Sequence, residues 1–178
     1  MLAVATCALM LTGCAQPDPV VTPRATSTVK PLFASDADAL AAATKAYAAY
    51  LKMSDLIAQE GGANPERLAP LVTPKWLKHE RGASAALAAS KKHQDGKTSF
   101  DHAKLQSYSS DTEGRANIGV YVCVDLSDDT LLNADDVDVT PEGVQARFPF
   151  VVNFVSKSPS SAALLLKGSE AWDGQNYC

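Results

Sequence analysis

The chain has 178 residues, with 16 basic and 20 acidic side chains and a formal charge of −4. This balance argues against nucleic acid as a partner, because nucleic-acid-binding proteins carry a basic face or stripe, and the longest basic cluster here is Lys91-Lys92-His93. From residue 36 to residue 178 the length suits a single domain with one core.

An uncharged apolar stretch opens the chain and runs from Met1 to Met10. It leads into Leu11-Thr12-Gly13-Cys14, which resembles the lipobox of bacterial prolipoproteins. The resemblance implies a signal peptide over residues 1–13 that is cleaved before Cys14, and a lipid anchor on that cysteine. No Lys or Arg precedes Arg24, so the basic start of a secretory signal is missing and we expect a signal truncated at its start.

Residues 14–35 have the composition of a tether. They contain few large apolar residues, five Ser or Thr and four prolines, at Pro17, Pro19, Pro23 and Pro31. Proline-rich chain is semi-extended at about 3 Å per residue. The sequence therefore predicts that the lipid holds the following domain close to the extracytoplasmic face of the cell membrane.

Three helices are predicted next. Ser35 and Asp38 form a capping pattern before a helix whose apolar face includes Leu40, Tyr47 and Leu51, and Gly61-Gly62 ends it. Asn64-Pro65 and Thr73-Pro74 each place a capping residue before a proline, which predicts a short helix through residue 72 and a longer one to about residue 93.

The second half of the chain changes to a two-residue period. Strict alternation from Ala116 to Leu126 predicts a strand, and residues 148–154 repeat the pattern. Pro149 cannot donate to a ladder, so we expect this second strand at a sheet edge or bulged at the proline. Residues 98–108 and 161–172 complete four strands, with Gly168 as a candidate bulge.

Helices followed by long antiparallel strands predict an α+β domain, with N-terminal helices packed on a curved four-stranded antiparallel sheet. This order resembles the nuclear transport factor 2-like, or ketosteroid-isomerase-like, cone fold, behind a lipobox and Pro/Thr tether of the kind common in actinobacterial lipoproteins. The closing segment from Ala163 to Trp172 also carries the resemblance. It implies an open-ended apolar pocket between the helices and the sheet, and it says almost nothing about activity.

Two cysteines remain once Cys7 is removed with the signal peptide and Cys14 is lipidated. In an oxidising compartment Cys123 and Cys178 are expected to form a disulfide, and two unpaired cysteines are the alternative. Their spacing does not fit a CxxC redox or zinc motif.

The candidate pocket residues are aromatic side chains and one histidine: Tyr47, Trp76, Phe100, His102, Phe148 and Phe150. His102 is two residues after Phe100, so in a regular strand both side chains point to the same face, which we expect to be the inward one. The Asp101 side chain would then point to solvent. Aromatic residues at this spacing equally fit a solid core. A proton-shuttling role for His102 competes with that of a hydrogen-bonded, partly buried histidine.

Sites for metals, nucleotides and nucleophilic catalysis find no support in the sequence. The acidic stretch from Asp125 to Asp138 lacks the central glycine and final glutamate of an EF-hand, which favours a solvated connection between strands. No Gly-x-Ser-x-Gly elbow and no phosphate-binding glycine loop occurs, so we expect no cofactor.

Three functions follow as hypotheses. The first is a non-catalytic, membrane-anchored module that binds an apolar small molecule or an envelope protein. The second is an isomerase- or hydrolase-like enzyme that uses the cone pocket. The third is a passive envelope protein that acts through its surface.

Overall fold

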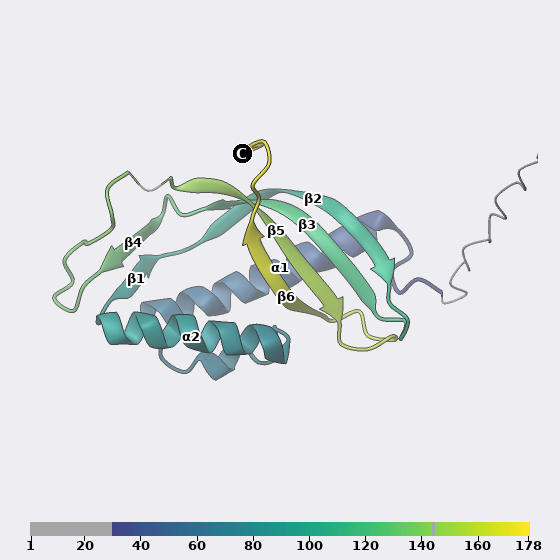
Figure 1. Ribbon diagram of the computed structural model, residues 1–178, viewed down its shortest axis with the longest axis horizontal. Helices are drawn as coiled ribbons and strands as arrows, with labels where there is room; N and C mark the ends of the chain where they lie inside the picture. The colour runs from purple at the N-terminus through teal and green to yellow at the C-terminus, as the bar shows by residue number, and fades with distance from the viewer. Residues whose placement is uncertain (1–29, 144) are drawn as a thin grey trace, which may run out of the picture.

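The computed structural model describes residues 30–143 and 145–178. The predicted signal peptide, the predicted lipidation site at Cys14 and nearly all of the predicted tether lie outside these residues. Two helices, α1 (Asp36–Gln59) and α2 (Pro74–Ser90), lie on one side of an antiparallel four-stranded sheet, and the C-terminal segment lies on the other side (Figure 1). The predicted α+β class is confirmed.

The helix caps form largely as the sequence predicts. The Ser35 hydroxyl accepts the Asp38 N–H at 3.1 Å, and the Thr73 hydroxyl accepts the Trp76 N–H at 3.3 Å. Asn64 makes no side-chain cap, and the middle helix is a single 3₁₀ turn, η1 (Pro65–Leu68), shorter than expected. No helix among the residues described is both long and apolar enough to cross a bilayer.

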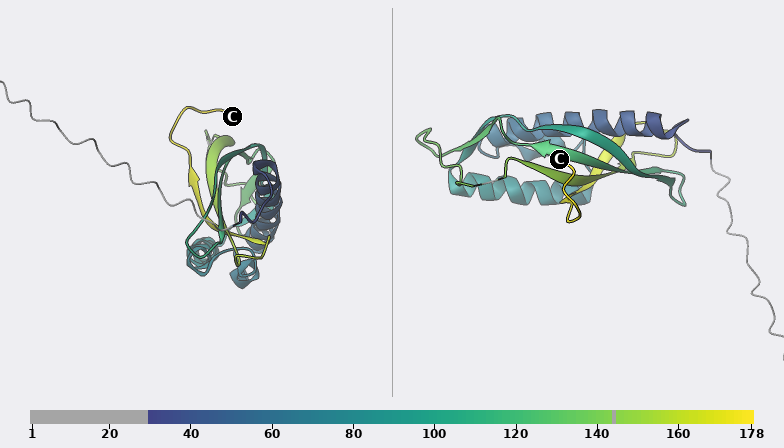
Figure 2. Two further views of the ribbon diagram at one scale, coloured as in Figure 1. Left: turned by 90° about the vertical axis from the view of Figure 1, so that its right-hand side faces the viewer. Right: turned by 90° about the horizontal axis from the view of Figure 1, so that it is seen from above.

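The large sheet has the order β2-β3-β5-β6, with β2 (Ser99–Ser110), β3 (Ala116–Asp125), β5 (Arg147–Ser156) and β6 (Leu164–Ala171). The inward side chains of β3 and β5 alternate as predicted and meet α1 in one core. Its most deeply buried members include Ile118, Val120, Val122, Val152, Phe154 and Leu166. The views of Figure 2 show the sheet curving over the helices.

The predicted edge position of β5 is wrong, because β5 lies between β3 and β6. Pro149 is tolerated there because it pairs with Cys123 on one side and lies beyond the last β6 pair, Phe150 with Ala171, on the other. Its carbonyl accepts the Trp172 N–H just past the end of β6. No ladder hydrogen bond therefore needs a Pro149 donor. The register shift of β5 and β6 lies beside Gly168, where a bulge was predicted.

A second, two-stranded sheet was not predicted. It pairs β1 (His93–Gly96) with β4 (Asp129–Leu132) and extends the molecule past the ends of both helices (Figure 1). The link from β1 to β2 therefore runs beside the C-terminal half of α1. This crossing point is where the candidate site forms.

Candidate functional site

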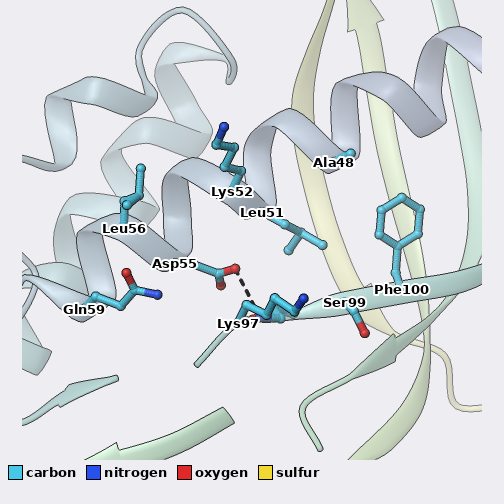
Figure 3. A pocket seen from close by; sticks show the side chains of 10 residues that line it. Ala48, Leu51, Lys52, Asp55, Leu56, Gln59, Lys97, Ser99 and Phe100 are labelled. Atoms are coloured by element: carbon cyan, nitrogen blue, oxygen red, sulfur yellow. Dashed lines mark hydrogen bonds between the residues drawn. The ribbon is translucent and has the colours of Figure 1, made fainter. Parts of the chain in front are cut away.

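A groove of about 400 Å³ lies between α1 and the start of β2. Leu51 and Phe100 supply its apolar surface, and Asp55, Lys97 and Gln59 lie at its polar end (Figure 3). We call it the α1 groove. The groove is open to solvent along α1, where Lys52 and Leu56 are exposed.

A second cavity, of about 460 Å³, lies between the two helices, the small sheet and the segment that leads into β5. We call it the inner cleft. Most of its lining is apolar, and its polar groups come from β1, β4 and the segments on either side of β4. The lining residues are Ala58, Leu87, Gln94, Leu126, Ser127, Asp129, Thr130, Leu131, Thr140, Pro141 and Ala146.

Asp55 is a buried carboxylate that lines the α1 groove and contacts Gln94 of the inner cleft. It is 8% exposed, on the apolar face of α1, one turn after Leu51. Its oxygens accept the Thr98 backbone N–H at 3.1 Å and the Gln94 side-chain amide at 3.4 Å. Because a buried charge needs such partners, Asp55 fastens the β1–β2 link to the helix and orients Gln94.

Asp129 is the acid that faces the inner cleft. Its Oδ1 is buried and has no hydrogen-bond partner among the described residues. Burial raises the pKa of Asp129, and the negative charge of Asp55 raises it further, while Gln94 and Thr130 act in the opposite direction. The charged form of Asp129 is therefore less favourable here than that of an exposed aspartate, and its carboxyl group is the candidate polar anchor for a ligand in the cleft.

Gly96 sets the position of Asp129, its partner in the small sheet. Gly96 has a φ of +106°, and a Cβ there would lie 1.8 Å from the Asp128 carbonyl oxygen. Only glycine allows this close approach of β1 to the turn before β4. The Gln59 amide donates to the Gly96 carbonyl at 2.6 Å and ties the same point to α1.

Most of the aromatic residues proposed from the sequence pack into or against the core. Tyr47 is 3% exposed and contacts Phe100 edge-to-face at 4.8 Å, and Phe148 lies 5.6 Å from Phe150. Burial raises the pKa of Tyr47 to about 12. Among the six candidates, Phe100 alone lines one of the two cavities, and Trp76 is half-buried on α2, stacked on His79.

His102 does not face inward as predicted. The β2–β3 register shifts between Asp101 and Lys104, and His102 adopts a φ of +49°. This bulge turns its ring to the solvent side, where Nδ1 lies 2.6 Å from Asp101 Oδ1 and the Arg147 guanidinium bonds the same carboxylate. A pocket mechanism built on His102 is therefore ruled out by position.

Cys123 and Cys178 form the predicted disulfide, with their Cα atoms 5.6 Å apart. Asp101, His102 and the Cys123 sulfur lie within 4.8 Å of one another. Since that sulfur is bonded to Cys178, it offers no thiolate, and Arg147 already neutralises Asp101. The group is therefore an ion-pair network beside the disulfide.

Asp55, Gln94 and Asp129 were not predicted as site residues from the sequence. One signal was available for Asp55, because it falls on the buried stripe of α1 four residues after Leu51. Asp129 belongs to the acidic stretch from Asp125 to Asp138, which was predicted to be a solvated connection between strands. Four residues of that stretch form β4.

Asp129→Asn is expected to make the protein more stable at pH 8, by about 2 °C in the unfolding midpoint. The folded state raises the Asp129 pKa, so it binds that proton more tightly than the unfolded state does. The stabilising contribution of the protonated acid is therefore complete at low pH and is lost as the pH rises through the folded pKa.

Thermal unfolding of both proteins between pH 3.5 and pH 8 checks this, with Asp128→Asn as the exposed neighbouring control. The difference between Asp129→Asn and wild type should shrink toward pH 3.5. A difference that does not change with pH would contradict the assigned titration.

No family model matches the chain, and no curated protein matches it. Solved structures that share its fold include two from different proteins. One is described as the intermembrane space region of chloroplast protein ARC6, with a TM-score of 0.52, 15% identity, and coverage of 76% of this chain and 97% of the other. The second is a periplasmic fragment of TraM, with a TM-score of 0.52, 13% identity, and coverage of 80% and 100%. At these identities the similarity establishes the fold alone.

Proposed function

We propose that this chain is a lipid-anchored, extracytoplasmic module that binds an apolar small molecule in the inner cleft without transforming it. The observation that carries the proposal is a mostly apolar cleft of about 460 Å³ lined by Asp129, whose buried Oδ1 has no hydrogen-bond partner among the described residues. Ligand sites in proteins combine an apolar wall with a few polar groups that orient the ligand.

The proposed location has three independent supports. Leu11-Thr12-Gly13-Cys14 resembles a lipobox, the Cys123–Cys178 disulfide fits an oxidising compartment, and both structural neighbours are described as intermembrane-space or periplasmic regions. We also propose a relation to the cone fold. This relation is supported by the two helices that pack on a curved sheet and by the cavities lined by residues of the helices and the strands.

The acids define the ligand's polar end. Asp55 carries a buried negative charge close enough to affect Asp129, so an anionic group in the cleft would be repelled. The Asp129 carboxyl group would hydrogen-bond a ligand hydroxyl, as acceptor when ionised and as donor when protonated. The ligand class that fits is therefore a neutral amphiphile with an alkyl or ring body.

The experiment compares 1-decanol with decanoate, which share a chain and differ in the charge of the head group. At pH 7, decanol far above its Kd should raise the unfolding midpoint by about 5 °C, and decanoate should not. Ala58→Leu fills the cleft from α1 and should abolish the shift, whereas Ala49→Leu, exposed on the same helix, should retain it. Equal responses to both compounds, or an undiminished decanol shift in Ala58→Leu, would contradict the proposal.

An isomerase- or hydrolase-like enzyme is the second candidate, and the raised pKa of Asp129 favours it, because a proton-transfer group works best when its pKa lies nearer the working pH. In this function Asp129 would exchange a proton with the bound molecule. Asp129→Asn would then abolish turnover while the decanol shift persists. Conversion of a bound ligand by the wild type, lost in this variant, would replace the binding function by catalysis.

A further inference from the structure

The outer face of the large sheet carries a third pocket, which shares no lining residue with the two cavities described above. It has a volume of about 230 Å³ and is lined by Lys104, Tyr121, Trp172 and Tyr177. These residues come from β2, β3 and the C-terminal segment, which crosses the side of the sheet that the helices leave uncovered (Figure 1). We call it the outer aromatic pocket.

The Tyr121 ring stands nearly at right angles to each of the other two rings. Tyr121 contacts Trp172 with centroids 5.2 Å apart and planes at 75°, and it contacts Tyr177 at 5.9 Å and 76°. All three side chains are half-buried, so each keeps part of its surface in solvent. Together they form the walls of a corner instead of a filled cluster.

The corner is held in place by covalent and polar contacts. The Tyr177 hydroxyl lies within hydrogen-bond distance of the Val122 and Phe150 carbonyls, at 3.2 and 3.3 Å, and the next residue, Cys178, is bonded to Cys123. The Gln106 amide donates to the Tyr121 hydroxyl at 3.2 Å. Preorganised rings lose little freedom on binding, which favours affinity.

The free polar groups at this pocket are donors. Lys104 forms no ion pair, and the Trp172 indole N–H makes no hydrogen bond, within residues 30–143 and 145–178. An aromatic corner could also accept a quaternary ammonium group, but the Lys104 ammonium would repel it. The partner therefore presents acceptor oxygens, preferably anionic, beside an apolar face.

We propose that the outer aromatic pocket binds an acidic sugar unit of an envelope polysaccharide. A pyranose ring has one face of C–H groups that packs on the electron-rich face of an aromatic ring, and its ring and hydroxyl oxygens accept hydrogen bonds. A carboxylate on the sugar would pair with Lys104. The pocket is distinct from the inner cleft, so this site goes beyond the proposed function and can be tested independently.

The test uses the full chain in detergent and two disaccharides, measured by isothermal titration. N-acetylglucosaminyl-N-acetylmuramic acid carries a carboxylate, and N,N′-diacetylchitobiose is its neutral match. The acidic disaccharide should bind more tightly. Trp172→Ala should weaken both by about tenfold, the effect of losing about 1.4 kcal/mol of ring contact.

Lys104→Gln should remove the preference for the acidic disaccharide and leave the neutral one unchanged. Lys167→Gln, an exposed lysine on the same sheet, is the matched control and should behave as wild type. Trp172→Phe keeps a ring and should retain more affinity than Trp172→Ala, which separates ring contact from disturbance of the C-terminal segment.

Three results would overturn the proposal. The first is that neither disaccharide binds saturably. The second is that neither Trp172→Ala nor Lys104→Gln changes the affinity. The third is that hexaproline binds saturably and depends on Trp172, while the sugars do not bind. Because Ala58 lines the inner cleft and does not line the outer aromatic pocket, Ala58→Leu should leave disaccharide binding intact. Failure here and failure of the proposed cleft function are therefore distinguishable.

Discussion

Phe154→Ala is expected to lower the free energy of unfolding by about 3–5 kcal/mol, the range observed when a buried phenylalanine is truncated. Phe154 is 0% exposed in the middle of β5, where it pairs with Ile118 on one side and Leu166 on the other. Its ring meets Tyr47 of α1 edge-on, with centroids 6.5 Å apart. The substitution therefore leaves a cavity where the sheet and the long helix meet.

Urea unfolding followed by circular dichroism measures this loss. Val155→Ala is the matched control, because Val155 is the next residue of β5, points to the opposite face and is only half-buried. Its cost should be about 1 kcal/mol or less. Comparable losses in the two variants would mean that the core does not lie where α1 meets β5.

Removal of the Cys123–Cys178 disulfide is expected to cost about 4 kcal/mol in the chain-entropy account. The two residues are 55 positions apart, so the bond restricts a long loop of the unfolded chain. It also holds the C-terminal segment, including Tyr177, against the outer face of the sheet. The double variant Cys123→Ala/Cys178→Ala should therefore be less stable than the oxidised wild type by this amount.

Unfolding with and without a reductant supplies the control. The reductant should lower the stability of the wild type to near that of the double variant and leave the double variant unchanged. Hydrogen exchange should also quicken in residues 172–178 and leave α1 protected. Equal stability of the oxidised wild type and the double variant would contradict this role.

The elements that the sequence predicted well are long and strongly periodic. The alternation from Ala116 to Leu126 corresponds to β3, and the capping residue Ser35 marks the start of α1. In contrast, β1 and β4 have four residues each, too few to show a period. They form because they pair with each other across the end of the helices, and a pairing between distant segments leaves little trace in local sequence.

The wrong predictions concern backbone irregularities. The alternation of side chains along a regular strand predicted that His102 points inward. The bulge after Asp101 turns its side chain outward instead. An alternation rule carries no information about where an extra residue enters a strand. The same limit applies to Pro149, whose position depends on where the neighbouring strand β6 ends.

The candidate site was predicted least well, because its parts come from four separate places. Asp55 belongs to α1, Gln94 to β1 and Asp129 to β4, while Leu87 of α2 completes the inner cleft. Only the Asp55 position had a sequence signal, a charged residue on an apolar helix face. The raised pKa of Asp129 arises from burial and from Asp55, and both depend on the tertiary structure.

Native mass spectrometry of the mature protein, released from its own membrane in detergent, tests the central claim most directly. A lipid-anchored binding module should carry the mass of a diacylglycerol on Cys14, lack two hydrogens at the disulfide and retain a reproducible non-covalent ligand of neutral, apolar character. The Ala58→Leu variant should lose that ligand and keep the lipid. A wild-type protein with no bound ligand, or with the same ligand retained in Ala58→Leu, would contradict binding in the inner cleft.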